Sequence, residues 1–234
     1  YFRRCYCIIA PSKYTAKALR KKIMERKIEV LPTGIDIEKF SGGDGSEIRR
    51  RYKDKKIILH VGRIVREKNL DLLIEAAPYI LKQTDAVFII VGEGPAKAEL
   101  EEKVKKKNLQ KHFIFTGFVK DEDLPDYYKS ADVFVFPSIY ETQGIVAFEA
   151  MAAGVPVAAS TAKALPDFIK DGENGYLFDP YDAEECAEKV IEAMESKEIA
   201  KRASKFVMGY SIEKMTDRLL EIYSFGDYKN EGEM

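Results

Sequence analysis

The sequence Val133-Phe-Val-Phe-Pro137, followed closely by Glu141-Thr-Gln-Gly-Ile-Val-Ala-Phe-Glu149, predicts a buried strand, a turn that contains glycine, and a helix. The short apolar run that ends at Pro137 is typical of a strand in a parallel sheet that is covered on both faces. The helix leaves its first backbone amides, around Thr142 to Ile145, without intrahelical acceptors, and its dipole favours a phosphate there. Because Gly144 carries no side chain, a ligand can approach the backbone closely.

Two glutamates bracket this turn, and each has a plain interpretation when it is considered alone. Glu141 would be a solvated loop residue and Glu149 a partly exposed helix residue. Glu149, however, lies next to Phe148, Ala150 and Met151 in the sequence, and an unpaired ionised carboxylate on so apolar a face costs roughly several kcal/mol. The vicinal hydroxyls of a ribose would be suitable partners. With the turn, the two carboxylates predict a site for the phosphates and sugar hydroxyls of a nucleotide-sugar.

Strand patterns and helical patterns alternate along most of the chain. Strands are expected at 56–62, 86–92, 112–116, 132–137, 155–159 and 175–178, and helices near 70–81, 96–107, 122–130, 144–153 and 183–194. This alternation predicts an α/β fold with a doubly wound, Rossmann-like parallel sheet. Ligands of such sheets bind beyond the carboxyl ends of the strands, so the loops there are expected to converge on one site.

Further motifs surround the opening stretch: His60-Val-Gly-Arg63, Glu67-Lys-Asn-Leu70, Val91-Gly-Glu-Gly-Pro95, Phe115-Thr-Gly-Phe-Val119, Ala131-Asp-Val-Phe-Val-Phe-Pro-Ser138, Gly154-Val-Pro-Val157 and Asp171-Gly-Glu-Asn-Gly-Tyr-Leu-Phe178. Together with the E-x7-E spacing of Glu141 and Glu149, they resemble the motifs of retaining glycosyltransferases of family 4, the glycosyl transferases group 1. The resemblance covers roughly residues 30 to 195. It implies a GT-B fold, in which two Rossmann-like halves face each other across a cleft, and it identifies this chain as mainly the C-terminal, donor-binding half.

The resemblance also implies roles for individual residues. Glu141 would lie nearest the transferred sugar as the catalytic carboxylate, without a covalent role, and Glu149 would bind the ribose. The remaining donor-binding residues would be Arg63 and Lys68 at the diphosphate, Phe118 and Val119 beside the base, and Thr142, Gln143, Gly144 and Ile145 around the phosphates and sugar. From position alone, Arg63 could equally form a surface salt bridge, Lys68 could be solvated, and Phe118 and Val119 could border the core.

No metal or separate cofactor is expected, and the nucleotide diphosphate sugar enters as the donor substrate. Asp121-Glu-Asp123 matches the D-x-D string of metal-dependent transferases, but it precedes a helical pattern and is better interpreted as an acidic helix start. The chain has only two histidines, His60 and His112, so no zinc constellation is predicted. Both histidines are expected to be satisfied core residues.

Three parts of the chain are expected. Residues 1–34 would be the C-terminal remnant of a preceding acceptor domain, with a strand at 5–10 and a helix from 12 to about 26. Residues 35–205 would form the donor-binding Rossmann-like domain, after an interdomain crossing at 30–36 and a flexible loop at 41–45. Residues 206–234 would be a C-terminal crossover helix, with helical patterns at 197–209 and 211–223, and a polar, frayed tail from 226. With most of the acceptor half absent, weak or no transfer is expected of this chain alone.

Composition limits the partners and the location. A net charge of −1 gives no reason to expect nucleic acid. The longest apolar stretch, 145–159, is too short and too interrupted to span a bilayer, and three cysteines without disulfide-like spacing suggest a reducing compartment. A cytoplasmic location is therefore expected. The basic helix near 13–27 leaves contact with the inner face of a membrane as an alternative to simple solvent exposure.

The sequence thus predicts a retaining, metal-independent glycosyltransferase that moves a sugar from a UDP- or GDP-sugar to a lipid or glycan acceptor. Many relatives carry Phe where Gln143 stands, and the Glu-Thr-Gln-Gly form is similar to members that glycosylate lipids, so the resemblance points to a lipid acceptor. Two alternatives stay open. One is a nucleotide-sugar epimerase or a phosphorylase with the same two-domain fold, and the other is a non-catalytic nucleotide-sugar-binding module.

Overall fold

The computed structural model of the protein describes residues 5–23 and 26–230. Residues 1–4 and 24–25 of the predicted N-terminal remnant, and residues 231–234 of the predicted tail, lie outside the described residues.

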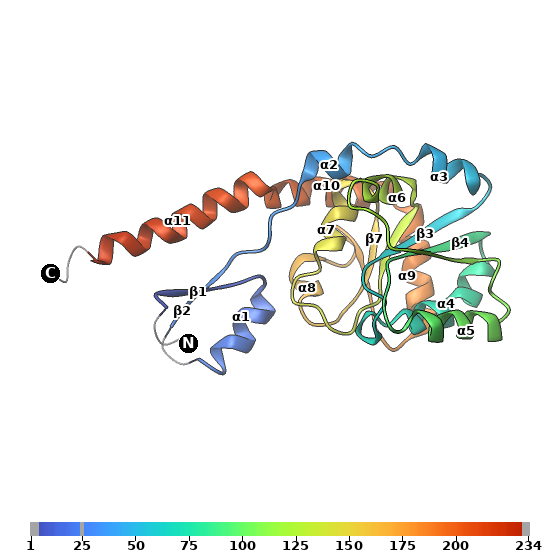
Figure 1. Cartoon of the computed structure of the whole chain (residues 1–234), viewed down its shortest axis with the longest axis horizontal. Coiled ribbons are helices and arrows are strands. Elements are labelled where there is room, and N and C mark those ends of the chain that lie inside the picture. Colours follow the sequence, from blue (N-terminus) through green and yellow to red (C-terminus); the bar gives the residue numbers. More distant parts are fainter. Residues whose placement is uncertain (1–4, 24–25, 231–234) are drawn as a thin grey trace.

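A six-stranded parallel sheet forms the centre of the larger unit (Figure 1). Its strands are β3 (Lys56–Val61), β4 (Ala86–Val91), β5 (Phe113–Gly117), β6 (Val133–Phe136), β7 (Val157–Ser160) and β8 (Tyr176–Phe178). They lie in the order β5-β4-β3-β6-β7-β8, and every neighbouring pair is parallel. The chain therefore winds outward from β3 in one direction and from β6 in the other, which confirms the predicted doubly wound sheet. The reversal of strand order lies between β3 and β6.

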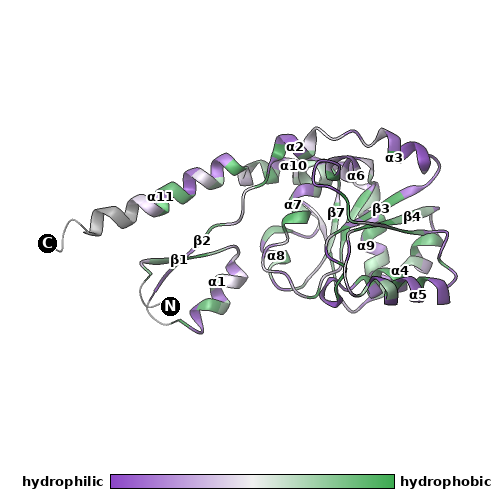
Figure 2. Cartoon of the chain, in the orientation of Figure 1, coloured by the Kyte–Doolittle hydropathy of each residue, from purple (hydrophilic) through white to green (hydrophobic). Residues whose placement is uncertain are grey.

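Helices cover both faces of this sheet, because alternate strand residues point to opposite sides. Ile57 and Leu59 of β3 belong to one core, whereas Ile58 belongs to the other. The first core is completed by α2 (Ile37–Ser41), α6 (Leu124–Ser130), α7 (Ile145–Ala152), α8 (Leu165–Phe168) and α10 (Lys197–Val207). The second is completed by α4 (Leu70–Leu81), α5 (Lys97–Lys106) and α9 (Ala183–Glu195). In Figure 2 the inner strands are mainly hydrophobic, whereas α3 (Ser46–Arg51) and α5 at the periphery are strongly hydrophilic.

A second, smaller unit lies beside the first and consists of β1 (Cys7–Ala10), α1 (Lys13–Arg20) and β2 (Lys27–Val30). The helix predicted to reach about residue 26 ends at Arg20, and β2 was not predicted. Both differences have one cause. β2 pairs with β1 in parallel, and a parallel pair needs a crossover connection, which α1 supplies before the chain returns to the sheet.

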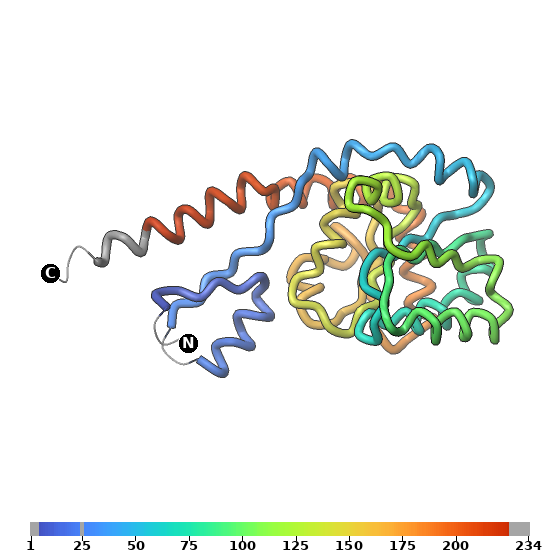
Figure 3. The backbone as a smooth tube through the Cα atoms, in the orientation of Figure 1, coloured from blue at the N-terminus to red at the C-terminus, as the bar shows by residue number. Residues whose placement is uncertain are grey.

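Residues 31–36 carry the chain from this small unit to α2, as the backbone path in Figure 3 shows. The expected loop at 41–45 begins one residue late, because α2 extends to Ser41. The short helices α2, α3 and α8 were not predicted, since each has too few turns to show a helical period.

The C-terminal helix α11 (Ile212–Asn230) projects away from the sheet (Figure 1). The prediction of a frayed tail from residue 226 is wrong for 226–230, which are helical. A single glycine, Gly226, costs a helix only about 1 kcal/mol relative to alanine, which is too little to end it. Among the described residues, no helix combines the length and the apolar character needed to cross a bilayer.

Candidate functional site

The reversal of strand order brings together residues from two distant parts of the chain. The 3-10 helix η2 (Arg66–Lys68) follows β3, and the loop that carries Glu141 follows β6. Lys68 Nζ and Glu141 Oε1 form an ion pair whose side chains are 19% and 12% exposed. Lys68 Nζ also lies 5.2 Å from the centre of the Phe136 ring. Crevices at such reversals, beyond the carboxyl ends of the strands, are where ligands of open α/β sheets bind.

Asn69 fixes the backbone beside Lys68. It adopts a left-handed conformation, with φ of 54°, between η2 and α4. Its side-chain nitrogen donates to the carbonyl oxygens of Pro137, at 3.2 Å, and of Pro180, at 2.8 Å. The loops after β6 and β8 are therefore tied to the same point, and the position of Lys68 is set by the fold as well as by its ion pair.

The turn before α7 offers backbone amides to solvent or ligand. Gly144 is the N-cap of α7 and has a φ of 87°, a conformation that favours glycine. None of the backbone N–H groups of residues 142–146 has an acceptor among the described residues. Thr142 is exposed and Ile145 is half-buried. The turn therefore presents a group of N–H donors at a helix N-terminus, immediately after Glu141 in the sequence. An anion site needs such donors.

Glu149 is held by a residue that the sequence did not single out. The Tyr128 hydroxyl, on the fully buried Tyr128 side chain of α6, donates to Glu149 Oε2 at 2.6 Å. Burial raises the pKa of the Glu149 carboxyl above its ordinary value, and the hydrogen bond from Tyr128 acts in the opposite direction. The other carboxylate oxygen, Oε1, has no hydrogen-bond partner among the described residues. It is not among the fully buried polar atoms that lack a partner. Tyr128 thus orients the group and leaves one oxygen available.

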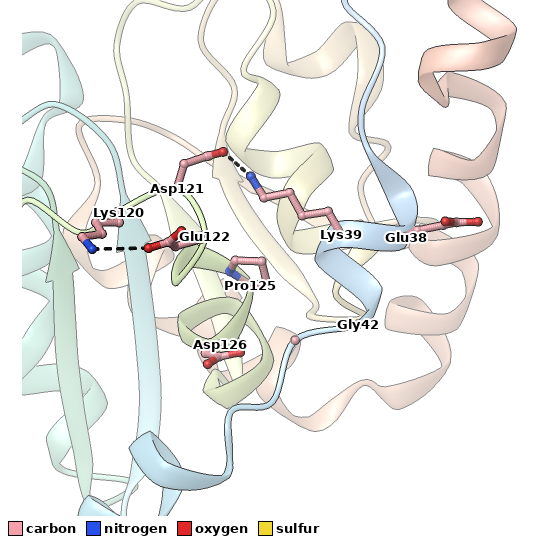
Figure 4. A pocket seen from close by; sticks show the side chains of 9 residues that line it. Glu38, Lys39, Gly42, Lys120, Asp121, Glu122, Pro125 and Asp126 are labelled. Atoms are coloured by element: carbon pink, nitrogen blue, oxygen red, sulfur yellow. Dashed lines mark hydrogen bonds and ion pairs between the residues drawn. The ribbon is translucent and has the colours of Figure 1, made fainter.

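A cleft of about 740 Å³ lies where α2 faces the start of α6 (Figure 4). Lys39 and Asp121 form an ion pair in this cleft, and Lys120 pairs with Glu122 at 3.3 Å. Asp121 raises and Lys39 lowers the pKa of Glu149, so this charge pair acts on the Glu149 carboxyl group.

A second hollow of about 350 Å³ shares Lys120 with that cleft and is lined by Phe118 and Val119. Phe118 is 78% exposed, and Val119 is half-buried. Phe118 therefore offers a free aromatic face, whereas Val119 packs against the first core, as the alternative of a core-bordering residue expected.

Arg63 and Gln143, two further predicted site residues, have surroundings that differ from each other. Arg63 is exposed, and within the part of the chain that the structure describes it forms no ion pair, so the alternative of a surface salt bridge is not seen. Gln143 is buried, and its side-chain amide forms hydrogen bonds with the backbone of Thr33.

The acidic D-x-D string is divided between two tasks. Asp121 pairs with Lys39, whereas Asp123 is the N-cap residue of α6, so the string stands at a helix start as expected, although the Asp123 side chain forms no capping hydrogen bond. Within residues 5–23 and 26–230, no three His, Cys, Asp or Glu side chains gather as metal ligands would.

His60 is only partly the satisfied core histidine that was expected. Its Nδ1 lies 3.0 Å from the Val135 carbonyl oxygen, whereas its buried Nε2 has no partner among the described residues. Complete burial lowers the pKa of His60 to about 4. His60 is therefore neutral near neutral pH, with Nδ1 as the donor.

Comparison with known proteins agrees with this geometry. The family model described as "Glycosyl transferases group 1" matches residues 45–207. The sulfoquinovosyl transferase of Arabidopsis thaliana is 37% identical over 74% of this chain and 34% of its own length. The alpha-monoglucosyldiacylglycerol synthase of Acholeplasma laidlawii is 31% identical over 88% of this chain and 53% of its own length. The chain thus spans about a third to a half of these relatives.

A solved structure shows the same arrangement of elements. The sucrose-phosphate synthase of Thermosynechococcus elongatus aligns with a TM-score of 0.84 and 26% identity, over 95% of this chain and 59% of its own. The family model covers most of the six-stranded unit, from α3 to the end of α10. The chain therefore belongs to the glycosyl transferases group 1 family.

Proposed function

We propose that this chain is the donor-binding half of a retaining, metal-independent glycosyltransferase that uses a UDP- or GDP-sugar. One observation carries the proposal. At the reversal of strand order, Lys68 pairs with Glu141, and the backbone amides of residues 142–146, which have no acceptor among the described residues, directly follow Glu141 in the chain. A cation and a set of N–H donors suit a diphosphate, and a carboxylate beside them suits a sugar.

The reaction breaks the bond between the anomeric carbon and a diphosphate oxygen, which departs with the bonding electrons. The acceptor oxygen forms its bond on the same face of the sugar, and the proton of the acceptor hydroxyl passes to the departing diphosphate. Lys68, Arg63 and the turn amides would stabilise the negative charge on that leaving group. Glu141 would stabilise positive character at the anomeric carbon without forming a covalent bond.

The nucleoside would lie towards Glu149. The free Oε1 of that residue would accept hydrogen bonds from the ribose, while Tyr128 holds Oε2. The exposed ring of Phe118, with Val119 beside it, would flank the base. Gln143 would act through the backbone of the turn, because its side chain is already bonded to Thr33.

The acceptor would be a lipid or a glycan. A lipid is favoured by the Acholeplasma relative, whose name describes a glucosyldiacylglycerol synthase and which matches 88% of this chain. A lipid acceptor would place the enzyme in the cytoplasm at the inner face of a membrane, in agreement with the exposed lysines of α1.

Binding and transfer assays test the proposal. A thermal-shift and calorimetric screen of uridine, guanosine and adenosine diphosphates and their sugars should identify one base that stabilises the chain. A longer protein that contains this chain should then move labelled sugar to an acceptor, and the chain alone should transfer little. Interconversion of the donor sugar would instead identify an epimerase, and binding without turnover by the longer protein would identify a binding module.

A further inference from the structure

The side-chain amide of Gln143 forms hydrogen bonds with both backbone polar groups of Thr33. Gln143 Oε1 accepts from the Thr33 backbone N–H at 2.9 Å, and Gln143 Nε2 donates to the Thr33 carbonyl oxygen at 3.1 Å. Gln143 is 7% exposed. One buried amide thus satisfies both polar backbone groups of a residue 110 positions away in the sequence, and losing it would leave those groups unpaired.

Thr33 belongs to the segment 31–36 that joins the two units. The far end of this segment is fixed to the junction before α11, because Ile35 N–H donates to the Tyr210 carbonyl oxygen at 2.9 Å and Ile212 N–H donates to the Ile35 carbonyl oxygen at 3.1 Å. Gln143 itself stands between Glu141 and the N-cap Gly144. The hydrogen bonds of Gln143 therefore connect the interunit segment directly to the turn that carries the candidate site.

The small unit touches the same loops at two further points. The Thr15 hydroxyl donates to the Thr142 carbonyl oxygen at 3.3 Å, and the Tyr14 N–H donates to Asp167 Oδ2 at 2.7 Å. The segment that carries Asp167 is in turn bonded to the turn, because Ala164 N–H donates to the Glu141 carbonyl oxygen at 3.3 Å. The first turn of α1 is thus hydrogen-bonded to the loop that follows β6 and to helix α8, which follows β7.

We propose that Gln143 is a positioning residue that couples the seating of the small unit to the geometry of the 141–146 turn. It does not touch the ligand. It holds the turn amides and Glu141 in one arrangement as long as Thr33 stays docked. A movement of the small unit that pulls Thr33 away therefore changes the nucleotide affinity of the turn. The nucleotide part of this inference depends on the proposed function, whereas the coupling itself does not.

Hydrogen exchange of the ligand-free chain tests the coupling. Gln143→Met keeps a side chain of similar volume but removes both hydrogen bonds, and Gln143→Glu keeps only the acceptor. Thr33 N–H should exchange at least about 10-fold faster in Gln143→Met than in the wild type, with Gln143→Glu between them. The amides of residues 147–148, in the first turn of α7, should also exchange faster, while the exchange rates of β3 and β4 stay unchanged. Gln83→Met, at an exposed glutamine just after α4, is the matched control and should change none of these rates.

A role in packing alone predicts that Gln143→Met exchanges like the wild type, and that result would overturn the proposal. Calorimetry supplies the second measurement, with the nucleoside diphosphate that binds the wild type. Gln143→Met should weaken its affinity about 3- to 10-fold, and Gln83→Met should not. Faster exchange at Thr33 without any change in affinity would refute the link to the ligand. If the wild type binds no nucleotide, the proposed function fails, and the exchange rates still decide whether the coupling exists.

Discussion

At the residue scale, the two glutamates of the E-x7-E stretch have different surroundings and should have different roles. Glu149 keeps one free oxygen beside the Tyr128 hydrogen bond, whereas Glu141 is paired with Lys68. The ribose is present in both the donor and the nucleotide product. Glu149→Ala should therefore weaken binding of the nucleoside diphosphate by about 10-fold, the effect of one or two lost hydrogen bonds.

Glu141→Ala should reduce turnover by more than it changes nucleotide affinity, because the proposed function places its carboxylate beside the transferred sugar. Calorimetry with the nucleoside diphosphate and transfer kinetics of the longer protein give the two values. If Glu141→Ala weakened nucleotide affinity more than turnover, and Glu149→Ala did the reverse, both role assignments would be wrong.

The ion pair of Lys68 and Glu141 gives a prediction about stability. Each side chain is mostly buried, so removal of either partner leaves the other charge poorly compensated. Lys68→Met and Glu141→Gln should each lower the free energy of unfolding by about 1–3 kcal/mol, and the double variant should lose clearly less than the sum. Urea unfolding of the four proteins measures this. Strictly additive losses would show that the two residues do not interact in solution.

The burial of Glu149 predicts a dependence of stability on pH. Because its pKa is raised from the ordinary value of 4.5, the folded protein binds more protons than the unfolded chain between that value and the raised one. Stability attributable to this group therefore falls as the pH rises through that window, and the loss is complete above the raised pKa.

Glu149→Gln removes this titration and can still accept the hydrogen bond from Tyr128. Relative to the wild type, the variant should thus gain stability as the pH rises from 4 upward, and other groups, including His60, cancel in the difference. A difference that stays constant from pH 4 to 8 would contradict the raised pKa.

At the scale of the elements, the parts that the sequence predicted well are those with long patterns. The helix at 70–81 was placed at its observed ends, and the strands of the large sheet were found to within about two residues, because their apolar runs are buried on both sides. β2 was missed because Lys27–Val30 alternates polar and apolar residues over only four positions, too few to identify a strand, and these residues gain their structure by pairing with β1.

The site shows the same limit. Glu141, Lys68 and the turn follow from local sequence and from the family resemblance, but the partners Tyr128 and Thr33 do not. Tyr128 meets Glu149 because α6 and α7 both pack against α2 in the same core, and Thr33 meets Gln143 because the interunit segment passes beside the turn. No local pattern encodes such contacts, so only the folded chain reveals them.

The start of helix α7 requires glycine at its N-cap position, Gly144. A Cβ atom on Gly144 would lie 2.8 Å from both Leu165 Cδ2 and Phe136 Cε1, and the residue has a φ of 87°. Gly144→Ala should therefore lower the free energy of unfolding by about 2–4 kcal/mol, the sum of backbone strain and overpacking. Gly172→Ala is the control, because Gly172 has a φ of 69° but no atom within 4 Å of its Cβ position. It should cost only the strain, about 1–2 kcal/mol. Equal losses in chemical unfolding would show that the contacts at Gly144 relax.

At the scale of the whole molecule, the two units differ in how much core supports them. The large sheet is buried between two extensive clusters. In the small unit, the buried hydrophobic residues that the structure describes are Ile8, Ala10, Ala16 and Ile28, with Leu19, Ile23 and Val30 packed against them. A two-stranded sheet with so small a core is marginal when isolated. The small unit therefore depends on its contacts with segment 31–36 and with the loops of the site.

Native-state hydrogen exchange should show this hierarchy and its link to the site. Amides of β1 and β2 should open at a free energy several kcal/mol below that of β3 and β4, because the small unit can detach while the large sheet stays folded. If detachment disturbs the turn, as the Gln143–Thr33 bonds require, a bound nucleotide must dissociate before the small unit can open. A nucleoside diphosphate at 100 times its Kd should then raise the opening free energy of β1 and β2 by up to about 2.7 kcal/mol.

Protection of β1 and β2 that does not change with nucleotide, while the turn itself is protected, would show that the two units move independently. Opening of β1, β2 and β3 at one common free energy would show that the chain unfolds as a single cooperative body.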